Sequence, residues 1–229
     1  MLPVNYRYEV RSLRNALRRF PWGELKYVLW LPVHLLPFFV IERMVTGYWP
    51  TQTWLDGKIP FCEWFVIPYC LWYPLLVAVG LWLLRKDREG FRRYMRFLAI
   101  TFFLSELIWL LLPNGQDLRP AVMPRDNLLT RLVAGLYAID TNANGFPSVH
   151  VVGAIGAVWA VRKTPSLRHH PAIRWAVAVL AALIGHSTLF IKQHAVLDVA
   201  SGLGLALAVG VPLYSSRRLH HFRPAIERE

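Results

Sequence analysis

The chain has 229 residues, of which 55% are apolar or aromatic, and its formal net charge is +12. The apolar residues fall into blocks of about 20, the length that crosses a bilayer, and this excludes a single soluble amphipathic domain. The basic residues are split among short segments beside these blocks, which argues against nucleic-acid binding because such a protein needs a compact basic face.

Six membrane spans are predicted, and the predicted fold class is therefore an all-α integral membrane bundle. Prolines inside the first two spans are tolerable because neighbouring helices can satisfy the freed carbonyls. We expect one six-helix domain over residues 25–214, preceded by a basic segment at 1–24 and followed by a basic tail at 215–229. The predicted spans are 25–41, 61–84, 95–112, 147–161, 172–191 and 196–214.

The segment before the first span contains five arginines and no recognisable cleavable signal peptide. It is interpreted either as an amphipathic segment on anionic headgroups or as a plain topology signal. The chain has two cysteines, Cys62 and Cys70, and their spacing indicates neither a disulfide framework nor a metal site.

Lysine and arginine set the predicted orientation, because cytoplasmic loops of membrane proteins are enriched in them. With six spans, 20 of the 26 lysines and arginines lie on the side that holds both termini, including the predicted loops 85–96 and 162–174. Both termini are therefore expected to be cytoplasmic. Histidines in the basic loops are interpreted as solvated side chains.

The longest outer loop runs from about 113 to 146 and contains the stretch LLTRLVAGLYAI. Its apolar residues recur with helical period, which predicts an amphipathic helix in the third-to-fourth outer loop, on the membrane surface. Trp49, Trp54, Trp64 and Tyr48 fit an aromatic belt at the outer interface.

Three groups of reactive residue types fall on this outer side. They are numbered in chain order, and the third, at the turn between the fifth and sixth spans, is taken first. It contains His194 and Asp198, which are four residues apart, so a helix would place them on one face. The carboxylate could fix the imidazole tautomer and present the other nitrogen as a nucleophile or base. A structural His–Asp pair that joins two helices is the alternative.

The second group is the stretch Pro147-Ser148-Val149-His150 at the start of the fourth span. Ser148 suits the cap of a helix whose free N–H groups form an anion site, and His150 would reach the same anion and give up a proton. The first group is Arg119-Pro120, and arginine is a natural bidentate phosphate ligand. Considered alone, the second group could be a simple capped helix, and the arginine of the first group could be a solvated side chain.

The order and spacing of these groups resemble the type 2 phosphatidate phosphatase superfamily of membrane lipid phosphatases and phosphotransferases. That family carries Lys-x6-Arg-Pro, then Pro-Ser-Gly-His, then Ser-Arg-x5-His-x3-Asp, and LPNGQDLRP, PSVH and STLFIKQHAVLD match in part. The resemblance implies a catalytic nucleophile at His194, oriented by Asp198, and an acid–base at His150. It also implies phosphate binding by Arg119, Ser148, Val149 and Ser187.

Three positions depart from the family pattern: Leu112, Val149 and Thr188 replace its lysine, glycine and arginine. Two phosphate-binding cations are therefore missing, and Lys192 or Arg125 is a candidate to replace them. The looser motifs resemble the branch that includes inositol phosphorylceramide synthases. Thr188, His186 and Glu106 are predicted as possible supporting residues around the site, and Glu106 could instead be protonated or paired within the bundle, as could His34.

The function expected from this resemblance is hydrolysis of a lipid phosphate through a phosphohistidine, with no metal or other cofactor. The expected partners are a phosphorylated lipid and the bilayer, with no nucleic acid. A phosphotransferase that moves a phosphate or headgroup between lipids is the first alternative, and a non-catalytic lipid-phosphate binder is the second. The compact chain favours a bacterial inner membrane, with the active site on the non-cytoplasmic side.

Overall fold

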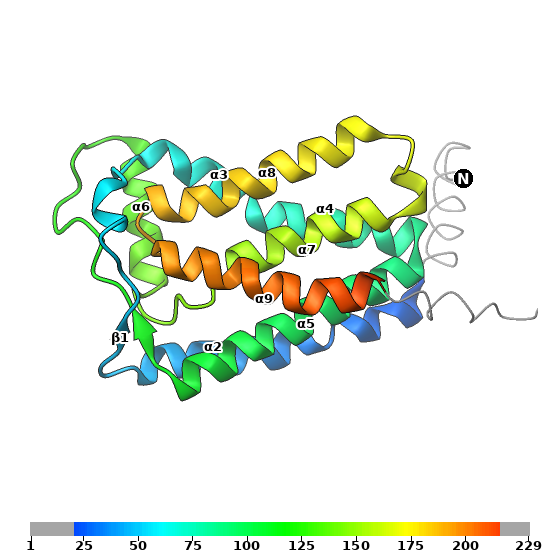
Figure 1. The fold of residues 1–229 in the computed structure, drawn as a ribbon, viewed down its shortest axis with the longest axis horizontal. Helices are drawn as coiled ribbons and strands as arrows, with labels where there is room; N and C mark the ends of the chain where they lie inside the picture. Colours follow the sequence, from blue (N-terminus) through cyan, green and yellow to red (C-terminus); the bar gives the residue numbers. More distant parts are fainter. Residues whose placement is uncertain (1–20, 216–229) are drawn as a thin grey trace, which may run out of the picture.

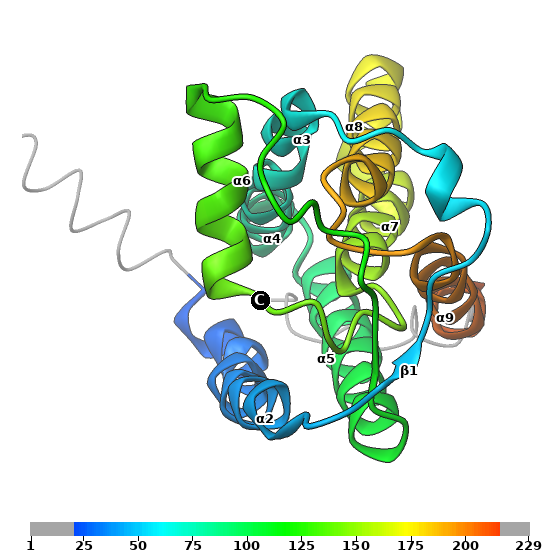
Figure 2. The same ribbon diagram turned by 90° about the vertical axis from the view of Figure 1, so that its left-hand side faces the viewer.

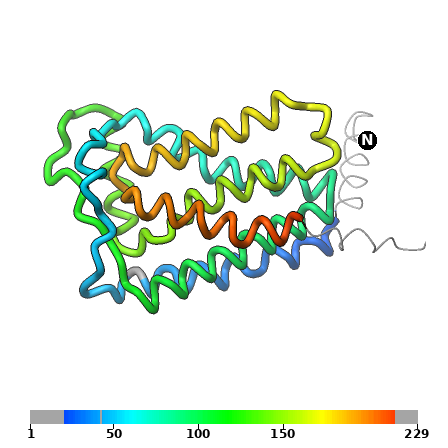
Figure 3. The backbone as a smooth tube through the Cα atoms, in the orientation of Figure 1, coloured from blue at the N-terminus to red at the C-terminus, as the bar shows by residue number. Residues whose placement is uncertain are grey.

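The computed structural model describes residues 21–215, which form a bundle of helices running along one long axis (Figure 1). The same path is seen as a tube in Figure 3. Two pairs of residues form very short strands, β1 and β2. The helices, including the short 3-10 helices marked η, are η1 (Trp22–Val28), α2 (Trp30–Met44), η2 (Asp56–Lys58), η3 (Glu63–Phe65), α3 (Val66–Cys70), α4 (Trp72–Lys86), α5 (Arg88–Leu111), α6 (Leu128–Ile139), α7 (Val149–Lys163), η4 (Pro165–Leu167), α8 (Pro171–Phe190) and α9 (Val196–Ser215).

Five helical segments of the described chain are long and apolar enough to cross a membrane, so the protein is an all-α membrane protein. They correspond to the first, second, third, fifth and sixth predicted spans. The fourth, α7, has 15 residues, a length of about 22 Å, which is short for a bilayer core of about 30 Å. Six crossings and the cytoplasmic placement of both termini therefore stay predictions. The five segments are Trp22–Ile41, Glu63–Lys86, Arg88–Leu111, Pro171–Phe190 and Val196–Ser215.

The short helix α7 lies at the centre of the bundle, where it packs against α4, α5, α8 and α9. Most of its residues are small or β-branched and buried, such as Gly153, Ala157 and Val152. Small side chains let the neighbouring helices approach its backbone closely. The position of α7 explains why it needs no long lipid-facing surface.

The predicted loop at 85–96 is wrong, because most of this segment is helical. Helix α4 continues to Lys86 and α5 begins at Arg88, so only Asp87 joins them. The Asp87 carboxylate accepts a hydrogen bond of 2.9 Å from the Gly90 amide and caps α5. Hydropathy locates the end of the apolar part of a helix. Arginine, glutamate and methionine favour helix formation, so the helix itself continues beyond that point.

The second predicted span is interrupted: α3 ends at Cys70 and α4 begins at Trp72. Pro68 and Pro74 flank the break, and each removes a backbone donor from the helical ladder. The break turns α3 toward α6 and α8, and the ring of Tyr69 lies beside the active-site candidates described below.

One end of the bundle is covered by connecting segments, and α6 lies across it, roughly perpendicular to the long helices (Figure 2). Strand β1 (Trp49–Pro50) pairs in parallel with β2 (Asn114–Gly115), and Gly115 also bridges to Ala143. These pairings join the predicted first outer loop to both ends of the long one. Helix α6 occupies the segment predicted to form a helix; its position on a membrane surface stays a prediction.

Residues 21 and 215, the ends of the described chain, both lie toward the opposite end of the bundle (Figure 1). Both positions accord with termini on one side, and the side itself stays a prediction. The predicted basic segment at 1–24 falls mostly outside the described residues, and the predicted tail at 215–229 does so except for Ser215.

Candidate active site

Ser148 caps the N-terminus of α7 and connects this helix to α9. Its hydroxyl oxygen accepts a hydrogen bond of 3.5 Å from the Val151 amide, as expected of a helix cap, and its own amide donates to the Asp198 carbonyl over 3.1 Å. Gly202 of α9 makes this approach possible, because a Cβ there would lie 2.8 Å from the Ser148 carbonyl oxygen. The first turn of α7, with its free N–H groups, is therefore held against the start of α9.

His194 and Asp198 are neighbours, as predicted, but they do not share a helical face: His194 lies in the turn before α9 and Asp198 in the first turn of that helix. Nδ1 of His194 lies 3.6 Å from Oδ2 of Asp198, slightly longer than a hydrogen bond, and both residues are buried. The same Oδ2 accepts a hydrogen bond of 2.7 Å from the Ala195 amide, which fixes the carboxylate. The carboxylate therefore faces one imidazole nitrogen and leaves Nε2 for chemistry.

His150 meets His194 directly: its Nδ1 lies 3.4 Å from Nε2 of His194. The two rings meet edge to face, with centroids 5.5 Å apart. Tyr69 and Trp72 flank the His150 ring, with centroid distances of 4.5 Å and 4.7 Å. The second and third predicted clusters thus converge in one site, although they are 44 residues apart in the chain.

The turn that carries His194 is held from several directions. The carbonyl of Thr188 accepts hydrogen bonds from the amides of residues 193 and 194. The Tyr137 hydroxyl of α6 donates to the Ile191 carbonyl, and the buried amide of Gln116 donates to the Lys192 carbonyl over 2.9 Å. Burial raises the pKa of Tyr137 to about 12, so the hydroxyl keeps the proton that it donates.

Arg119 reaches the site through Gln193, the residue before His194. Its guanidinium donates to Oε1 of Gln193 and to the carbonyls of Asp140 and Thr141, and it lies 4.4 Å from the centre of the Tyr137 ring. The amide of Gln193 in turn donates to Asp140 over 3.1 Å. The first predicted cluster therefore lies next to the other two, with its cation also bound to the end of α6.

Lys192 binds the first outer loop. Its ammonium donates to the carbonyls of Asp56 and Ile59, over 3.1 Å and 2.5 Å. Burial lowers the pKa of this ammonium, and the nearby Asp56 carboxylate opposes that effect. The backbone of Lys192 is left-handed, with φ of 56°, which costs roughly 1 kcal/mol and is offset by these contacts. Arg125, the other candidate replacement cation, forms a two-point ion pair with Glu63.

Asp56 secures the start of α9 from the same loop. Its Oδ1 accepts a hydrogen bond of 2.7 Å from the Val196 amide, the first residue of α9, and Oδ2 accepts from the amide of Thr53 over 2.7 Å. The side chain is almost fully buried. Asp56 thus acts as a helix cap contributed from a distant part of the chain.

We predict that Asp56→Ala lowers the free energy of unfolding by about 1–2 kcal/mol, because a buried cap is lost. Thermal unfolding of the detergent-solubilised protein measures this. Asp126→Ala is the matched control, since its ion pair with Arg131 is largely exposed and should matter little. Equal unfolding temperatures for the two variants would contradict the capping role.

The remaining predicted residues lie around the site in different ways. The Ser187 hydroxyl donates to the Ile184 carbonyl and the Thr188 hydroxyl to the Gly185 carbonyl, so both hydroxyls form hydrogen bonds within α8. His186 is exposed on α8, with Nδ1 2.7 Å from the Ala182 carbonyl. Val149 is the first residue of α7 and is half-buried.

Glu106 is paired within the bundle. Its Oε1 lies 2.6 Å from Nδ1 of His34, and both side chains are buried between α5 and α2. This is one of the alternatives that the sequence leaves open for both residues. Phe102 and Phe103 lie against the imidazole, so the pair is shielded by aromatic rings.

Sequence reasoning missed several residues that shape the site. Tyr69 and Trp72 look like ordinary apolar residues of a span, Gln193 occupies an unspecified position of the third motif, and Asp140 lies in no motif. Gly145 touches the centre of the site, because a Cβ there would lie 2.7 Å from Oδ2 of Asp198 and 3.0 Å from Nδ1 of His194.

The assembled groups can perform phosphoryl transfer. A buried imidazole next to a carboxylate can attack, a second imidazole can move a proton, and a helix N-terminus can hold an anion. In residues 21–215, no group of three or more histidine, cysteine, aspartate or glutamate side chains is placed to hold a metal ion. Independence from metals stays a prediction.

Comparison with known proteins agrees with this chemistry. The family model described as PAP2 superfamily matches residues 38–211, three quarters of the chain and all three clusters. The class defined by fold and site is thus a phosphatase-family membrane protein. The chain belongs to the PAP2 superfamily, as its motifs predict. No curated protein and no solved structure matches it significantly.

Proposed function

We propose that the protein hydrolyses a lipid phosphate through a phosphohistidine intermediate. The observation that supports this most is the 3.4 Å approach of His150 to His194, at the N-terminus of a helix and beside a buried carboxylate. A nucleophile, a proton carrier and an anion site are thereby combined within one buried region.

In the first step, Nε2 of His194 attacks phosphorus, a new P–N bond forms, and the P–O bond to the lipid breaks. His150 gives its proton to the departing lipid oxygen. Asp198 stabilises the positive charge that develops on the His194 ring, because the carboxylate lies next to Nδ1. The phosphoryl group displaces the direct contact between the two imidazoles when it binds.

In the second step, water attacks the phosphohistidine. His150, now neutral, takes the water proton, the P–N bond breaks, and His194 returns to its starting state with release of inorganic phosphate. An alcohol in place of water gives the phosphotransferase alternative by the same bond changes. The order of events follows the rule that one residue serves as acid and then as base.

The phosphoryl oxygens would be held mainly by the start of α7. The N–H groups of Val149 and His150 and the hydroxyl of Ser148 lie at this end, and the helix dipole favours an anion there. Arg119 adds positive charge through the neighbouring Gln193. Ser187, Thr188 and Lys192 support the turn around His194, and their direct contact with phosphate is a further part of the proposal.

The lipid part of the substrate is proposed from the surroundings. The bundle exposes large apolar side chains along α2, α4, α5, α8 and α9, the surface that a bilayer would cover. The site lies at the end of the bundle away from residues 21 and 215 (Figure 1). With the basic segments at the opposite end cytoplasmic, this end faces the non-cytoplasmic side, and a bacterial inner membrane is the proposed location.

The decisive experiment is phosphate release by the purified full chain from a panel of lipid phosphates in detergent, with EDTA present. We expect inorganic phosphate from at least one lipid phosphomonoester or diphosphate. Radiolabel that appears in a second lipid instead indicates a transferase. Binding of the lipids with neither release of phosphate nor transfer of label to a second lipid would contradict both enzymatic proposals and favour the non-catalytic binder.

A further inference from the structure

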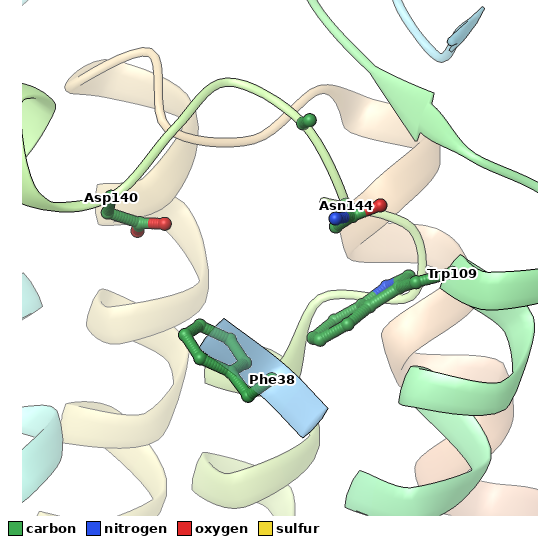
Figure 4. Close-up of a pocket in the computed structure, with 5 residues that line it drawn as sticks. Phe38, Trp109, Asp140 and Asn144 are labelled. Carbon is green, nitrogen blue, oxygen red and sulfur yellow. The ribbon is translucent and has the colours of Figure 1, made fainter. Parts of the chain in front are cut away.

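A small cavity lies between α2, α5 and the turn that precedes α7. Its lining comes from Phe38 of α2, Trp109 of α5 and Asp140, Ala143 and Asn144 of the turn. Figure 4 shows the side chains of Asp140 and Asn144 above the rings of Phe38 and Trp109. The two rings meet edge to face with centroids 5.8 Å apart and form an aromatic wall.

Two polar groups at this cavity have no hydrogen-bond partner in the described chain. Asn144 is 8% exposed, and neither its amide oxygen nor its amide nitrogen is bonded; Trp109 is 2% exposed, and its indole N–H is unbonded. Buried polar groups are normally paired. Unpaired groups of this kind at a cavity indicate a ligand that pairs with them.

The backbone around Asn144 is fixed by its conformation and by hydrogen bonds. Its backbone is left-handed, with φ of 57°, a conformation that asparagine tolerates. Its amide N–H donates to the carbonyl of Asn114, whose side chain in turn accepts a hydrogen bond from the Phe146 amide over 2.8 Å. The backbone that carries the Asn144 side chain is therefore fixed at the wall of the cavity.

The cavity adjoins the two histidines. Asn144 is bonded to Gly145, which lies against Asp198 and His194. On the other side, Oδ2 of Asp140 lies 3.5 Å from the hydroxyl of Tyr69, whose ring stacks on His150. The cavity is therefore separated from the two histidines only by Gly145 on one side and by Tyr69 on the other.

The chemistry of the lining selects the ligand. The Asn144 amide offers an acceptor and two donors, and the Trp109 indole offers one donor. A hydroxyl can donate to the amide oxygen while it accepts from an N–H, and the aromatic wall suits the alkyl chain beside it. Resting on the proposed function, we infer that the cavity selects lipid phosphates whose backbone carries a free hydroxyl near the phosphate ester.

The test compares two matched substrates on the full chain. One is a dodecyl glycerol ether phosphate with a free central hydroxyl, and the other is dodecyloxypropyl phosphate, which lacks it. We expect kcat/KM to favour the hydroxyl lipid by about tenfold or more, because a site built for a hydroxyl discriminates against its absence. Asn144→Gly keeps the left-handed backbone and removes the amide, and should bring this ratio close to one.

Trp109→Phe keeps an aromatic ring, removes the indole N–H and should also lower the ratio. Trp82→Phe, on the exposed face of α4, is the matched control and should keep the wild-type ratio. A wild-type ratio near one, with both lipids hydrolysed, would overturn the hydroxyl subsite and leave the proposed hydrolysis intact. A ratio unchanged in both Asn144→Gly and Trp109→Phe would overturn the assignment of the cavity.

If neither of these two lipids nor any lipid of the panel is hydrolysed, the proposed function fails, and the subsite is judged by binding. The two lipids are compared on His194→Ala protein by displacement of a bromine-bearing lipid phosphate that quenches tryptophan fluorescence. A preference of about tenfold for the hydroxyl lipid, lost when Asn144→Gly is added, supports the subsite. Equal displacement by the two lipids overturns it.

Discussion

His194→Ala is expected to reduce phosphate release by at least about 10³-fold, because it removes the attacking atom of the proposed reaction. The wild-type protein, mixed with radiolabelled lipid phosphate and quenched in base, should retain label as acid-labile phosphohistidine. His194→Ala should retain none. The measurement therefore reads both the rate and the covalent intermediate that defines the mechanism.

His169→Ala is the matched control for this histidine. His169 is exposed in the connection between η4 and α8, at the opposite end of the bundle from the site. It should keep the wild-type rate and the wild-type label. A monodisperse, folded His194→Ala protein with full activity would refute the nucleophile assignment.

Composition and hydropathy predicted the helical membrane character and the approximate position of most helices. Helix α9 was predicted at 196–214 and lies at Val196–Ser215, and α8 was predicted at 172–191 and lies at Pro171–Phe190. Both are bounded by polar turns, so the limits of the apolar run coincide with the limits of the helix. Helix α5 begins seven residues earlier than predicted, because its first turns are helical and charged.

The limits of the pattern are clearest at α7. Its sequence is apolar around the whole helix, which fits a span and fits equally a helix buried at the centre of a bundle. The packing against four other helices shows that α7 is central in the bundle, a position that a membrane span can also have. The pattern therefore located the helix to within two residues at each end, and the predicted crossing of the membrane by this helix stays a prediction.

The histidines of the site were predictable because their chemistry depends on residue type and local spacing. His194 lies in the turn before α9 and Asp198 in the first turn of α9, so their spacing brings the two side chains together although only Asp198 is helical; Ser148 and His150 share one helix start. Their supporting residues were not predictable, since Tyr69 acts through ring stacking and Asp56 through a cap on a helix 140 residues away. Such contacts depend on the fold and leave no local pattern.

Gly145→Ala is expected to reduce activity by about tenfold to a hundredfold. The backbone of Gly145 does not have a positive φ, so alanine is compatible with it and the effect comes from the added methyl group. That group would lie 2.7 Å from Oδ2 of Asp198 and 3.0 Å from Nδ1 of His194. Asp198 is fully buried and bonded to the Ala195 amide, so the methyl group must push the imidazole and carboxylate apart.

A displacement of this size is costly, because a shift of about 1 Å at a reacting group can lower the rate about a hundredfold. Gly204→Ala is the matched control: it lies in α9, where an added Cβ meets nothing within 4 Å. It should keep full activity and gain up to about 1 kcal/mol in stability through helix propensity. Wild-type turnover by folded Gly145→Ala protein would show that catalysis does not depend on the His194–Asp198 geometry seen in this structure.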